Sequence, residues 1–375
     1  MTDYTIVIIG AGAAGIGFGA ALRQFNLNDF LILEQGQIGD SFTKWPKTTR
    51  FITPSFPTNG FGFPDLNAVV PDTSPAFTFE KEHLSGSEYA NYLQRVAAHY
   101  TLPIKTQTPV TAIEKQADHY QIQTDTRHYS AKYVIMATGE FQNPNSVGIK
   151  NAHLGMHYGQ VDSFQVKSEQ PFLIIGGNES ACDALTHLAY LGNEVHLFTD
   201  HFGQNTTKPD PSISLAPITK ERLASIKAQA AGRVFITEHK TAQEITYSKG
   251  TYTVVFSDGS LAKSSHQPIL ATGFAPSFNQ IAGAELFEKD QHGLPLVTEQ
   301  DESTRYQNCF LIGPSLRHGE TIFCYIYKFR QRFAPIIREI AQREKLPIDK
   351  HGLAFYQANQ MYLDDLSCCQ VNCDC

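Results

Sequence analysis

The chain has 375 residues, a formal net charge of −7, 42% hydrophobic residues and 18% charged residues. Its length allows two or three domains with sizeable cores, and its composition is that of a globular protein. No run of Lys and Arg is present, so nucleic acid and an anionic membrane surface are not expected partners. Residues 4–22 are apolar, but no basic residue precedes them and they contain a fixed glycine pattern. We therefore expect no signal peptide or membrane span, and a cytoplasmic location.

The first predicted elements form a βαβ unit. Residues 5–9 predict a buried strand, a helix follows to about residue 25, and residues 30–33 predict a second strand that ends at Glu34. The turn after the first strand reads Gly10-x-Gly12-x-x-Gly15. The first glycine permits a tight turn, the second lets a pyrophosphate approach the backbone, and the third allows close helix–strand packing. With Glu34 available for a ribose hydroxyl, the pattern predicts a dinucleotide site.

A long segment without regular structure is predicted next, over residues 36–75, and a coil of that length is usually functional. A helix is expected over residues 85–99, with Ser85 or Ser87 as its N-cap. The following predicted strands cover residues 110–113, 120–124 and 131–136, and the last of them runs into Ala137-Thr138-Gly139.

The same pattern then recurs in a weaker form. A strand at 172–175 meets Gly176-Gly177-Asn178-Glu179-Ser180-Ala181, then a helix to about 191 and a strand at 194–198. Strands at 252–256 and 268–270 lead to a second Ala-Thr-Gly, at 271–273. Asn178 stands where the middle glycine is expected, so its side chain either crowds a pyrophosphate or binds it through the amide. A domain that has lost its ligand is the alternative.

The end of the second unit offers a weak signal for the choice of nicotinamide cofactor. Asp200 follows the strand at 194–198, and no Arg is next to it. An acidic side chain that reaches the ribose favours NADH over NADPH.

The last predicted elements are a strand at 308–312 and a helix at 325–343, which Pro335 kinks or divides in two. Because they have no sheet of their own, we expect them to return to the first domain. The predicted fold is α/β, with two Rossmann-like dinucleotide-binding domains, the second inserted in the first. Residues 1–160 and 275–375 form the first domain, residues 161–274 the second, and residues 364–375 a cysteine-rich tail.

Four of the seven cysteines lie in this tail: Cys368, Cys369, Cys373 and Cys375. An odd total without a secretory signal is typical of reduced thiols. Three interpretations stay open. The tail could bind a soft metal such as Zn²⁺ or Cu⁺, it could act as a mobile dithiol relay, or its cysteines could simply stay reduced.

The repeat suggests a division of labour, because two dinucleotide sites in one chain can bring a nicotinamide against a flavin. Hydride transfer between the rings needs orientation and a dry pocket but no catalytic base, so no catalytic residue is assigned.

The chain resembles the flavin-containing monooxygenase-like flavoproteins, which are NAD(P)- and FAD-dependent oxidoreductases. The glycine turn at 10–15, Glu34, the segment 39–46, both Ala-Thr-Gly turns and the segment 176–181 carry the resemblance. It is closest to a bacterial branch without a settled substrate that is linked with cation efflux. The chain is also similar to the bacillithiol disulfide reductases in domain order and in the segment 136–144.

The resemblance implies FAD on the first domain, NADPH or NADH on the second and a small-molecule substrate, and it leaves a homodimer open. The implied FAD residues are Gly10, Gly12, Ala13, Ala14, Gly15, Glu34, Gln35, Ser41, Phe42, Trp45, Arg50, Thr53, Val110, Ala137, Thr138, Gly139 and Gly313. The implied nicotinamide-cofactor residues are Gly176, Gly177, Asn178, Glu179, Ser180 and Ala181.

The chain departs from these families in three places. The linker signature of true monooxygenases is only loosely matched by the segment 155–158, and Pro314 follows Gly313 where many related flavoproteins have Asp. Ala14 stands where the bacillithiol-type enzymes have cysteine, and Cys-x-x-Cys pairs are absent. A monooxygenase-like oxidoreductase is the first expectation. A thiol or disulfide reductase that uses the tail as a relay, and a metal-binding or redox-sensing flavoprotein, are the alternatives.

Overall fold

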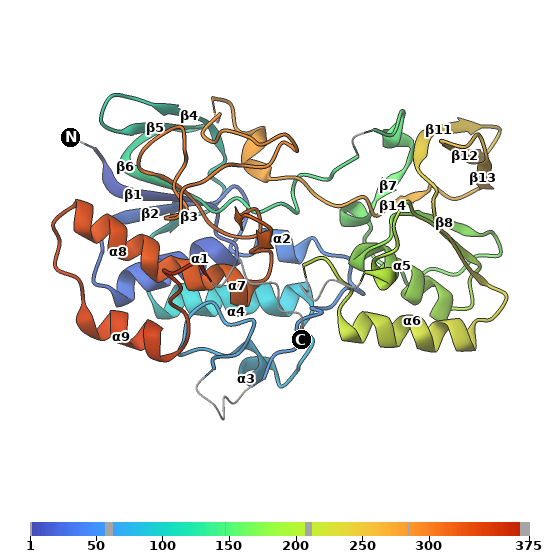
Figure 1. The fold of residues 1–375 in the computed structure, drawn as a ribbon, viewed down its shortest axis with the longest axis horizontal. Coiled ribbons are helices and arrows are strands. Elements are labelled where there is room, and N and C mark those ends of the chain that lie inside the picture. Colours follow the sequence, from blue (N-terminus) through green and yellow to red (C-terminus); the bar gives the residue numbers. More distant parts are fainter. Residues whose placement is uncertain (1, 57–62, 147, 207–211, 284, 368–375) are drawn as a thin grey trace. The chain divides into compact units, whose positions relative to one another are not determined.

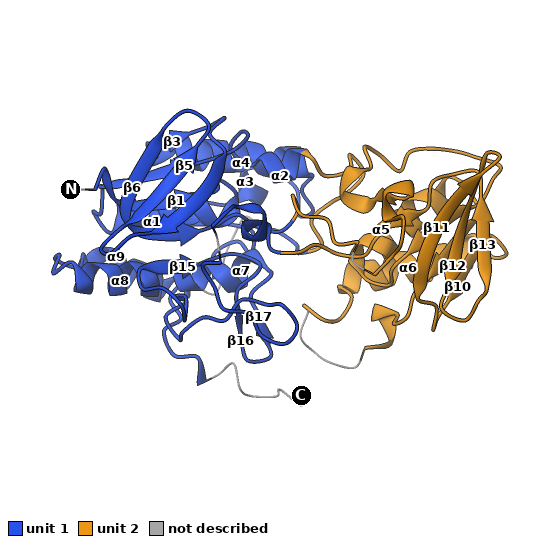
Figure 2. Ribbon diagram, turned by 90° about the horizontal axis from the view of Figure 1, so that it is seen from above, with its two compact units in different colours: residues 1–43, 53–140, 276–375 blue, residues 44–52, 141–275 orange. Residues whose placement is uncertain are grey.

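A computed structural model of the chain describes residues 2–56, 63–146, 148–206, 212–283 and 285–367. It divides into two compact units (Figure 2). Unit 1 comprises residues 1–43, 53–140 and 276–375, and unit 2 comprises residues 44–52 and 141–275. The second unit is thus inserted in the first. Together with the parallel sheets described below, this confirms the predicted fold class.

Unit 1 is built on a seven-stranded sheet (Figure 1) with the order β3-β2-β1-β6-β5-β4, in which β15 pairs with the second half of β6. The strands are β1 Tyr4–Ile9, β2 Phe30–Leu33, β3 Ile104–Lys105, β4 Val110–Lys115, β5 Tyr120–Thr124, β6 His128–Met136 and β15 Cys309–Leu311. All four residues of β2 and the last four of β1 and β6 are buried. Continuous apolar runs are typical of parallel strands covered on both faces.

The helices of unit 1 are α1 Ala13–Gln24, α2 Asp40–Thr43, α3 Pro75–Phe79, α4 Gly86–His99, α7 Ile326–Phe329, α8 Phe333–Arg343 and α9 Lys350–Ala358. Helix α1 packs against α4 and α8. Helix α4 begins at the predicted N-cap Ser85, which forms a capping box with Glu88. A short hairpin, β16 Arg317–His318 and β17 Thr321–Ile322, precedes α7.

The helix predicted over 325–343 is divided, in agreement with the two-helix alternative. A 3₁₀ turn, Arg330–Arg332, separates α7 from α8. Pro335 lies in the first turn of α8, where its missing N–H has no partner to lose.

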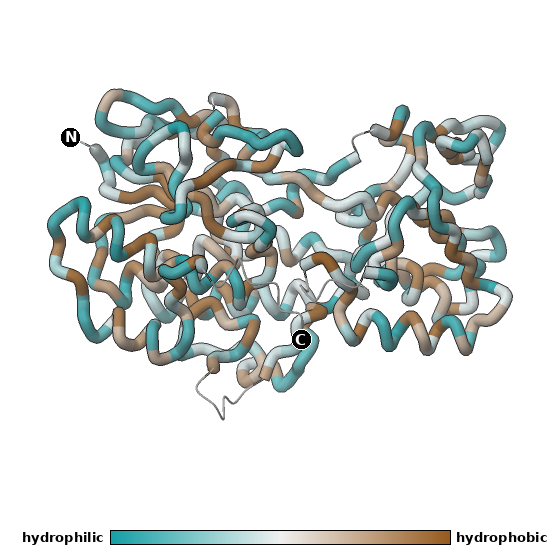
Figure 3. Tube along the Cα trace, in the orientation of Figure 1, coloured by the Kyte–Doolittle hydropathy of each residue, from teal (hydrophilic) through white to brown (hydrophobic). Residues whose placement is uncertain are grey.

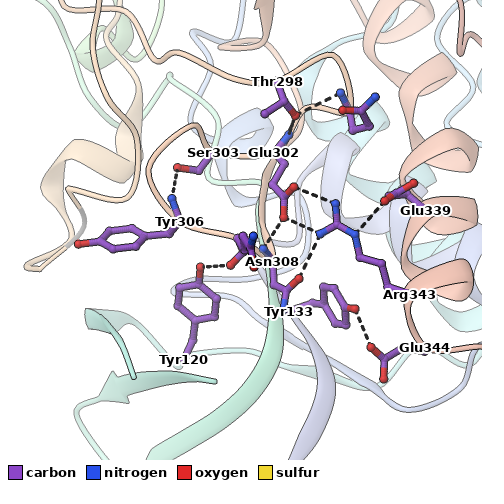
Figure 4. A network of polar contacts seen from close by, with 12 residues as sticks. Tyr120, Tyr133, Thr298, Glu302, Ser303, Tyr306, Asn308, Glu339, Arg343 and Glu344 are labelled. Carbon is purple, nitrogen blue, oxygen red and sulfur yellow. Dashed lines mark hydrogen bonds and ion pairs between the residues drawn. The ribbon is translucent and has the colours of Figure 1, made fainter. Parts of the chain in front are cut away.

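A polar network joins the returning segment to the rest of unit 1 (Figure 4). Arg343 of α8 donates from Nη1 and Nη2 to the carboxylate of Glu302, at 2.6 and 2.9 Å, and also to Asn308 Oδ1. Tyr133 of β6 donates to Glu344 at 2.6 Å. These contacts link α8 and the loop before β15 to the central strand of the sheet.

Unit 2 has a five-stranded parallel sheet of order β10-β9-β8-β14-β7, and a separate antiparallel sheet, β11-β12-β13. Its strands are β7 Met156–His157, β8 Phe172–Ile175, β9 Val195–Phe198, β10 Val234–Thr237, β11 Ala242–Ser248, β12 Thr251–Phe256, β13 Leu261–Ser264 and β14 Ile269–Leu270, and its helices are α5 Glu179–Tyr190 and α6 Pro217–Gln229. Alternate residues of β8 face two different cores: Phe172 and Ile174 join the core with α5, whereas Leu173 and Ile175 join the core with β11 and β12. Figure 3 shows hydrophobic residues along the strands of both units.

Candidate dinucleotide sites

The first glycine turn connects β1 to α1 in unit 1. Gly10 has a φ of +108°, and a Cβ atom on it would lie 2.5 Å from the carbonyl oxygen of Ala137. A Cβ atom on Gly15 would lie 1.9 Å from the carbonyl oxygen of Gly10. At both positions only glycine fits, as the sequence pattern predicts.

Gly12 differs, because a Cβ atom on it would meet no described atom within 4 Å. Gly12 is the N-cap of α1 and has no side chain that could cap the N–H groups of this helix end. A helix N-terminus with uncapped N–H groups and open space beside it fits an anionic group such as a pyrophosphate. Gly12, Ala13, Ala14 and Gly15 are the residues whose backbone would hold it.

Glu34 follows β2 and lies beside this turn. Its carboxylate is buried and accepts hydrogen bonds from the N–H groups of Ala11, at 2.7 Å, and Gly36, at 2.8 Å. Each carboxylate oxygen can accept more than one hydrogen bond, so a ribose hydroxyl can still be bound. The carbonyl of Glu34 accepts from Thr108 N, which brings the segment before Val110 to the same place. Gln35 is exposed.

The first Ala-Thr-Gly turn and Gly313 lie against the glycine turn. Leu311 of β15 pairs with Met136 of β6, so the chain leaves both strands at one edge of the sheet. Gly139 has a φ of +64°, and Gly313 has a φ of +98° and lies close enough that a Cβ on it would be 3.3 Å from Ala14 Cβ. Ala137, Thr138 and Gly313 therefore lie beside the glycine turn and the start of α1, and Gly139 follows them in the chain.

The residues predicted to line a flavin between Ser41 and Thr53 are divided between the units. Ser41, Phe42 and Thr53 belong to unit 1, where the ring of Phe42 packs 4.8 Å from that of Tyr89. Trp45 and Arg50 belong to unit 2.

Within unit 2, the ring of Trp45 packs against those of Phe51 and Phe141. The guanidinium of Arg50 donates to the carbonyls of Lys47 and Thr49, at 2.8 Å each. In the described contacts, the Arg50 side chain thus stabilises the segment 44–52, and the Trp45 ring packs this segment against Phe141.

The second glycine turn, between β8 and α5, is more crowded than the first. Gly176 has a φ of +134°, and a Cβ on it would lie 2.2 Å from the carbonyl oxygen of Ala271. A Cβ on Gly177 would meet Thr199 Oγ1 and His201 O at 2.3 Å. Asn178 is the N-cap of α5 but makes no capping hydrogen bond, and a Cβ on Gly203 would lie 2.4 Å from its Oδ1. Among the described contacts, the N-cap side chain of α5 therefore leaves the N–H groups of this helix end uncapped.

Glu179 contacts the start of α6. Its carboxylate accepts from Ala216 N and from Thr219 Oγ1, both at 2.6 Å, and burial raises the pKa of the carboxyl. Ser180 is partly buried, and Ala181 belongs to the core. Asp200 is exposed and lies 3.4 Å from His201 Nε2.

His157 joins β7 to the second Ala-Thr-Gly turn. Its Nδ1 accepts from Gly159 N at 3.2 Å, so its Nε2 carries the hydrogen and donates to the carbonyl of Gly273 at 2.9 Å. Burial lowers the pKa of His157. This neutral histidine packs against Phe274 and is a structural residue.

A buried polar cluster on α5 has no counterpart in the sequence motifs. Asp183 accepts from Tyr158 Oη at 2.6 Å and Thr49 Oγ1 at 3.0 Å, and lies 3.3 Å from His187 Nε2. Burial alone would raise the pKa of Asp183, but these hydrogen bonds and the imidazole outweigh it and lower the pKa. Asp183 thereby ties the segment 44–52 to α5. The spacing of Asp183 and His187, one helical turn apart, is the one sign of the cluster that the sequence offers.

Two described cysteines, Cys182 and Cys309, are buried, and a third, Cys324, is partly exposed. Burial raises the pKa of Cys182 to about 12 and raises that of Cys309 as well, so neither is a reactive thiolate at neutral pH. The cysteines of the tail, Cys368, Cys369, Cys373 and Cys375, lie outside the described residues. Within the described ranges there is no group of side chains that could hold a metal ion and no helix long and apolar enough to cross a bilayer.

Comparison with known proteins gives a family match. The family described as pyridine nucleotide-disulphide oxidoreductase matches residues 7–313. The uncharacterized oxidoreductase CzcO of Bacillus velezensis is 26% identical over 196 residues, and the chain spans about half of its length, 52%. The bacilliredoxin reductase Bdr of Bacillus subtilis is 22% identical over 348 residues, which cover 92% of this chain and 99% of that protein.

Solved structures show the same fold. The bacillithiol disulfide reductase Bdr from Staphylococcus aureus aligns with a TM-score of 0.72 at 19% identity, over 92% of this chain and 100% of the other. A flavin-containing monooxygenase from Stenotrophomonas maltophilia aligns with a TM-score of 0.68 at 16% identity, over 92% and 99%. Both relatives fall within the resemblances that the sequence motifs indicate.

Proposed function

The chain belongs to the pyridine nucleotide-disulphide oxidoreductase family, and on this premise we propose that it is an FAD-dependent oxidoreductase that oxidises NADH or NADPH. FAD binds to unit 1 at the turn between β1 and α1, and the nicotinamide dinucleotide binds to unit 2 at the turn between β8 and α5. When both are bound, FAD supplies a hydride acceptor and NAD(P)H the hydride donor.

The observation that carries the proposal is the contrast between the glycines of the first turn. At Gly10 and Gly15 a Cβ atom would clash with a backbone carbonyl oxygen, so the fold requires glycine there. Gly12 instead leaves space that no described atom fills, beside the start of α1, whose N-cap has no side chain. Because the described residues leave room for a Cβ atom at Gly12, packing does not require glycine there, and a ligand that approaches the backbone explains it better.

The residues of the chain would act by binding and orientation. The N–H groups at the start of α1 hold the FAD pyrophosphate, Glu34 accepts from the adenosine ribose, and residues 137–139 and Gly313 flank the dinucleotide. The start of α5 holds the pyrophosphate of the nicotinamide cofactor. The cluster around Asp183 holds α5 against Thr49 and Tyr158.

The reduced flavin must pass its electrons to a final acceptor. The first candidate is a monooxygenase-like reaction, in which oxygen is the acceptor and a small molecule is the substrate. The fold match to a flavin-containing monooxygenase supports it. The burial of Cys182 and Cys309 also supports it, since neither can serve as an active-site thiolate.

Disulfide reduction is the second candidate, and the full-length match to the bacilliredoxin reductase favours it. With Cys182 and Cys309 buried, this reaction would use the tail cysteines or the partly exposed Cys324.

The purified protein is first heated, and the released chromophore is identified. If the protein is colourless, it is reconstituted with FAD. Reduced protein is then offered oxygen with candidate substrates, or a low-molecular-weight disulfide. Substrate-dependent oxygen consumption without matching peroxide release supports monooxygenation. Disulfide turnover that is lost in the double variant Cys368→Ser/Cys369→Ser supports the second candidate. A protein that neither contains nor takes up FAD contradicts the whole proposal.

A further inference from the structure

Glu140 is an ionisable residue at the edge of the unit 1 sheet that the dinucleotide motifs do not include. It follows the first Ala-Thr-Gly turn, and Ser315 follows Gly313 and Pro314 at the end of the neighbouring strand. Ser315 is buried, and its Oγ donates to Glu140 Oε1 at 2.9 Å. The hydrogen bond joins the two segments that leave β6 and β15.

Both segments also adjoin the phosphate turn. A Cβ on Gly10 would lie 2.5 Å from Ala137 O, and a Cβ on Gly313 would lie 3.3 Å from Ala14 Cβ. Glu140 and Ser315 come a few residues after these contact points. In FAD, a polyol, the ribityl chain, continues from the pyrophosphate, so a hydroxyl-rich part of the ligand comes next to the turn.

The chemistry of Glu140 suits such a neighbour. Its carboxyl oxygens can accept hydrogen bonds from hydroxyl groups. Burial raises the pKa of the carboxyl, although the hydrogen bond from Ser315 and the charge of Arg317 act in the opposite direction. In the part of the chain that the structure describes, Arg317 Nε is buried without a hydrogen-bond partner. A hydrogen-bond donor is therefore available close to Glu140.

We propose that Glu140 binds FAD by a hydrogen bond between its carboxyl group and a hydroxyl of the ribityl chain, with Ser315 as the residue that positions it. This inference rests on the proposed binding of FAD to unit 1 and adds a residue to that site.

The experiment measures the affinity of the apoprotein for FAD and, separately, for ADP, which contains the adenosine and pyrophosphate but no ribityl chain. Saturating NAD⁺ or NADP⁺ is present in both titrations, so that the proposed nicotinamide-cofactor site of unit 2 is filled. The variants are Glu140→Ala, Glu140→Gln and Ser315→Ala, with Glu320→Ala as a matched control because Glu320 is an exposed carboxylate in the nearby hairpin. The thermal midpoint of each apoprotein is recorded to exclude misfolded variants.

We expect Glu140→Ala to weaken FAD binding about 3- to 10-fold, which corresponds to one neutral hydrogen bond. Glu140→Gln should retain most of the affinity, Ser315→Ala should weaken it to a smaller extent, and ADP binding should be the same in all variants. Unchanged FAD affinity in Glu140→Ala overturns the inference. Equal losses for FAD and ADP also overturn it, because they would mean that Glu140 only shapes the turn. If the wild-type apoprotein binds ADP but no FAD, the proposed function itself fails.

Discussion

At the scale of single residues, the three glycines of the first turn have different reasons to be glycine. Gly15 has no room for a Cβ atom, which would lie 1.9 Å from a backbone oxygen, whereas Gly12 has open space and a φ of −81°. The first is required by the fold, whereas at the second the described residues leave room for a Cβ atom. Substitutions at the two positions should therefore separate folding from cofactor binding.

We predict that Gly12→Val lowers the stability of the apoprotein by about 1 kcal/mol at most, because Val is a poor N-cap, but weakens FAD binding at least tenfold, because the side chain fills the place of the pyrophosphate. Gly15→Ala should instead lower the stability of the apoprotein by about 1–3 kcal/mol or more through overpacking. Circular dichroism melting and FAD titration check both. A Gly12→Val protein with wild-type FAD affinity would contradict the assignment of the turn.

His157 gives a prediction for pH. Its pKa is lowered by burial, so the folded protein holds the neutral form while the unfolded chain takes up a proton near pH 6.5. The contribution of His157 to stability is thus present above that pH and is lost as the pH falls toward its lower folded pKa.

Thermal midpoints of wild type and His157→Gln between about pH 5 and pH 8 test this. The advantage of the wild type should shrink with acidification. An advantage that grows at acid pH would mean that His157 is charged in the folded protein.

At the scale of elements, most of the predicted strands and helices are confirmed, because hydrophobic periodicity and glycine turns are local signals. Helices α6 and α9 and strands β10, β11 and β13 are among the elements that were missed. Strand β10 has no fully buried residue, and α6 is polar apart from a few buried positions, so neither has a strong pattern. The assignment of residues 44–52 to unit 2 could not be predicted either. It depends on Thr49 and Tyr158 meeting Asp183, residues that are far apart in the chain.

The Asp183 cluster should hold the segment 44–52 against α5. Tyr158→Phe removes a hydrogen bond to a buried carboxylate and should destabilise unit 2 by about 1–3 kcal/mol. Tyr247→Phe, at an exposed site in the same unit, is the control and should have no effect. Denaturant unfolding followed by circular dichroism measures both. Equal behaviour of the two variants would show that the cluster adds no stability.

The network in Figure 4 should stabilise the returning segment in a similar way. The carboxylate of Glu302 is nearly buried and faces Arg343, whose side chain is 30% exposed. Arg343→Met should cost about 1–3 kcal/mol, less than for a fully buried pair because water reaches the guanidinium. The control Arg338→Met breaks an exposed ion pair with Asp364 and a hydrogen bond to Tyr362 Oη, and should cost about 0–1 kcal/mol. Urea unfolding would contradict this account if the control were the more harmful change.

At the scale of the whole molecule, two dinucleotide-binding units in one chain are expected from the repeated strand–glycine turn–helix pattern, and the family match confirms the class of protein. The acceptor is not predictable in the same way. Under the proposed function it depends on the tail cysteines, which lie outside the described residues, or on side chains such as Trp45 and Arg50, whose place in unit 2 no local motif predicts. Glycine turns specify cofactors because phosphates need backbone N–H groups, whereas a substrate pocket needs side chains from many segments.

The most direct test of the account is the anaerobic mixing of FAD-loaded protein with NADPH and, separately, NADH, followed by the flavin absorbance. The account predicts that at least one nucleotide bleaches the flavin. We also predict slower bleaching in Asn178→Asp. This variant should remain folded and keep its FAD, because Asp is a good N-cap. Its side chain places a negative charge where the pyrophosphate of the nicotinamide cofactor would bind. A wild-type protein that holds FAD and is bleached by neither nucleotide would contradict the central claim that the two turns serve hydride transfer.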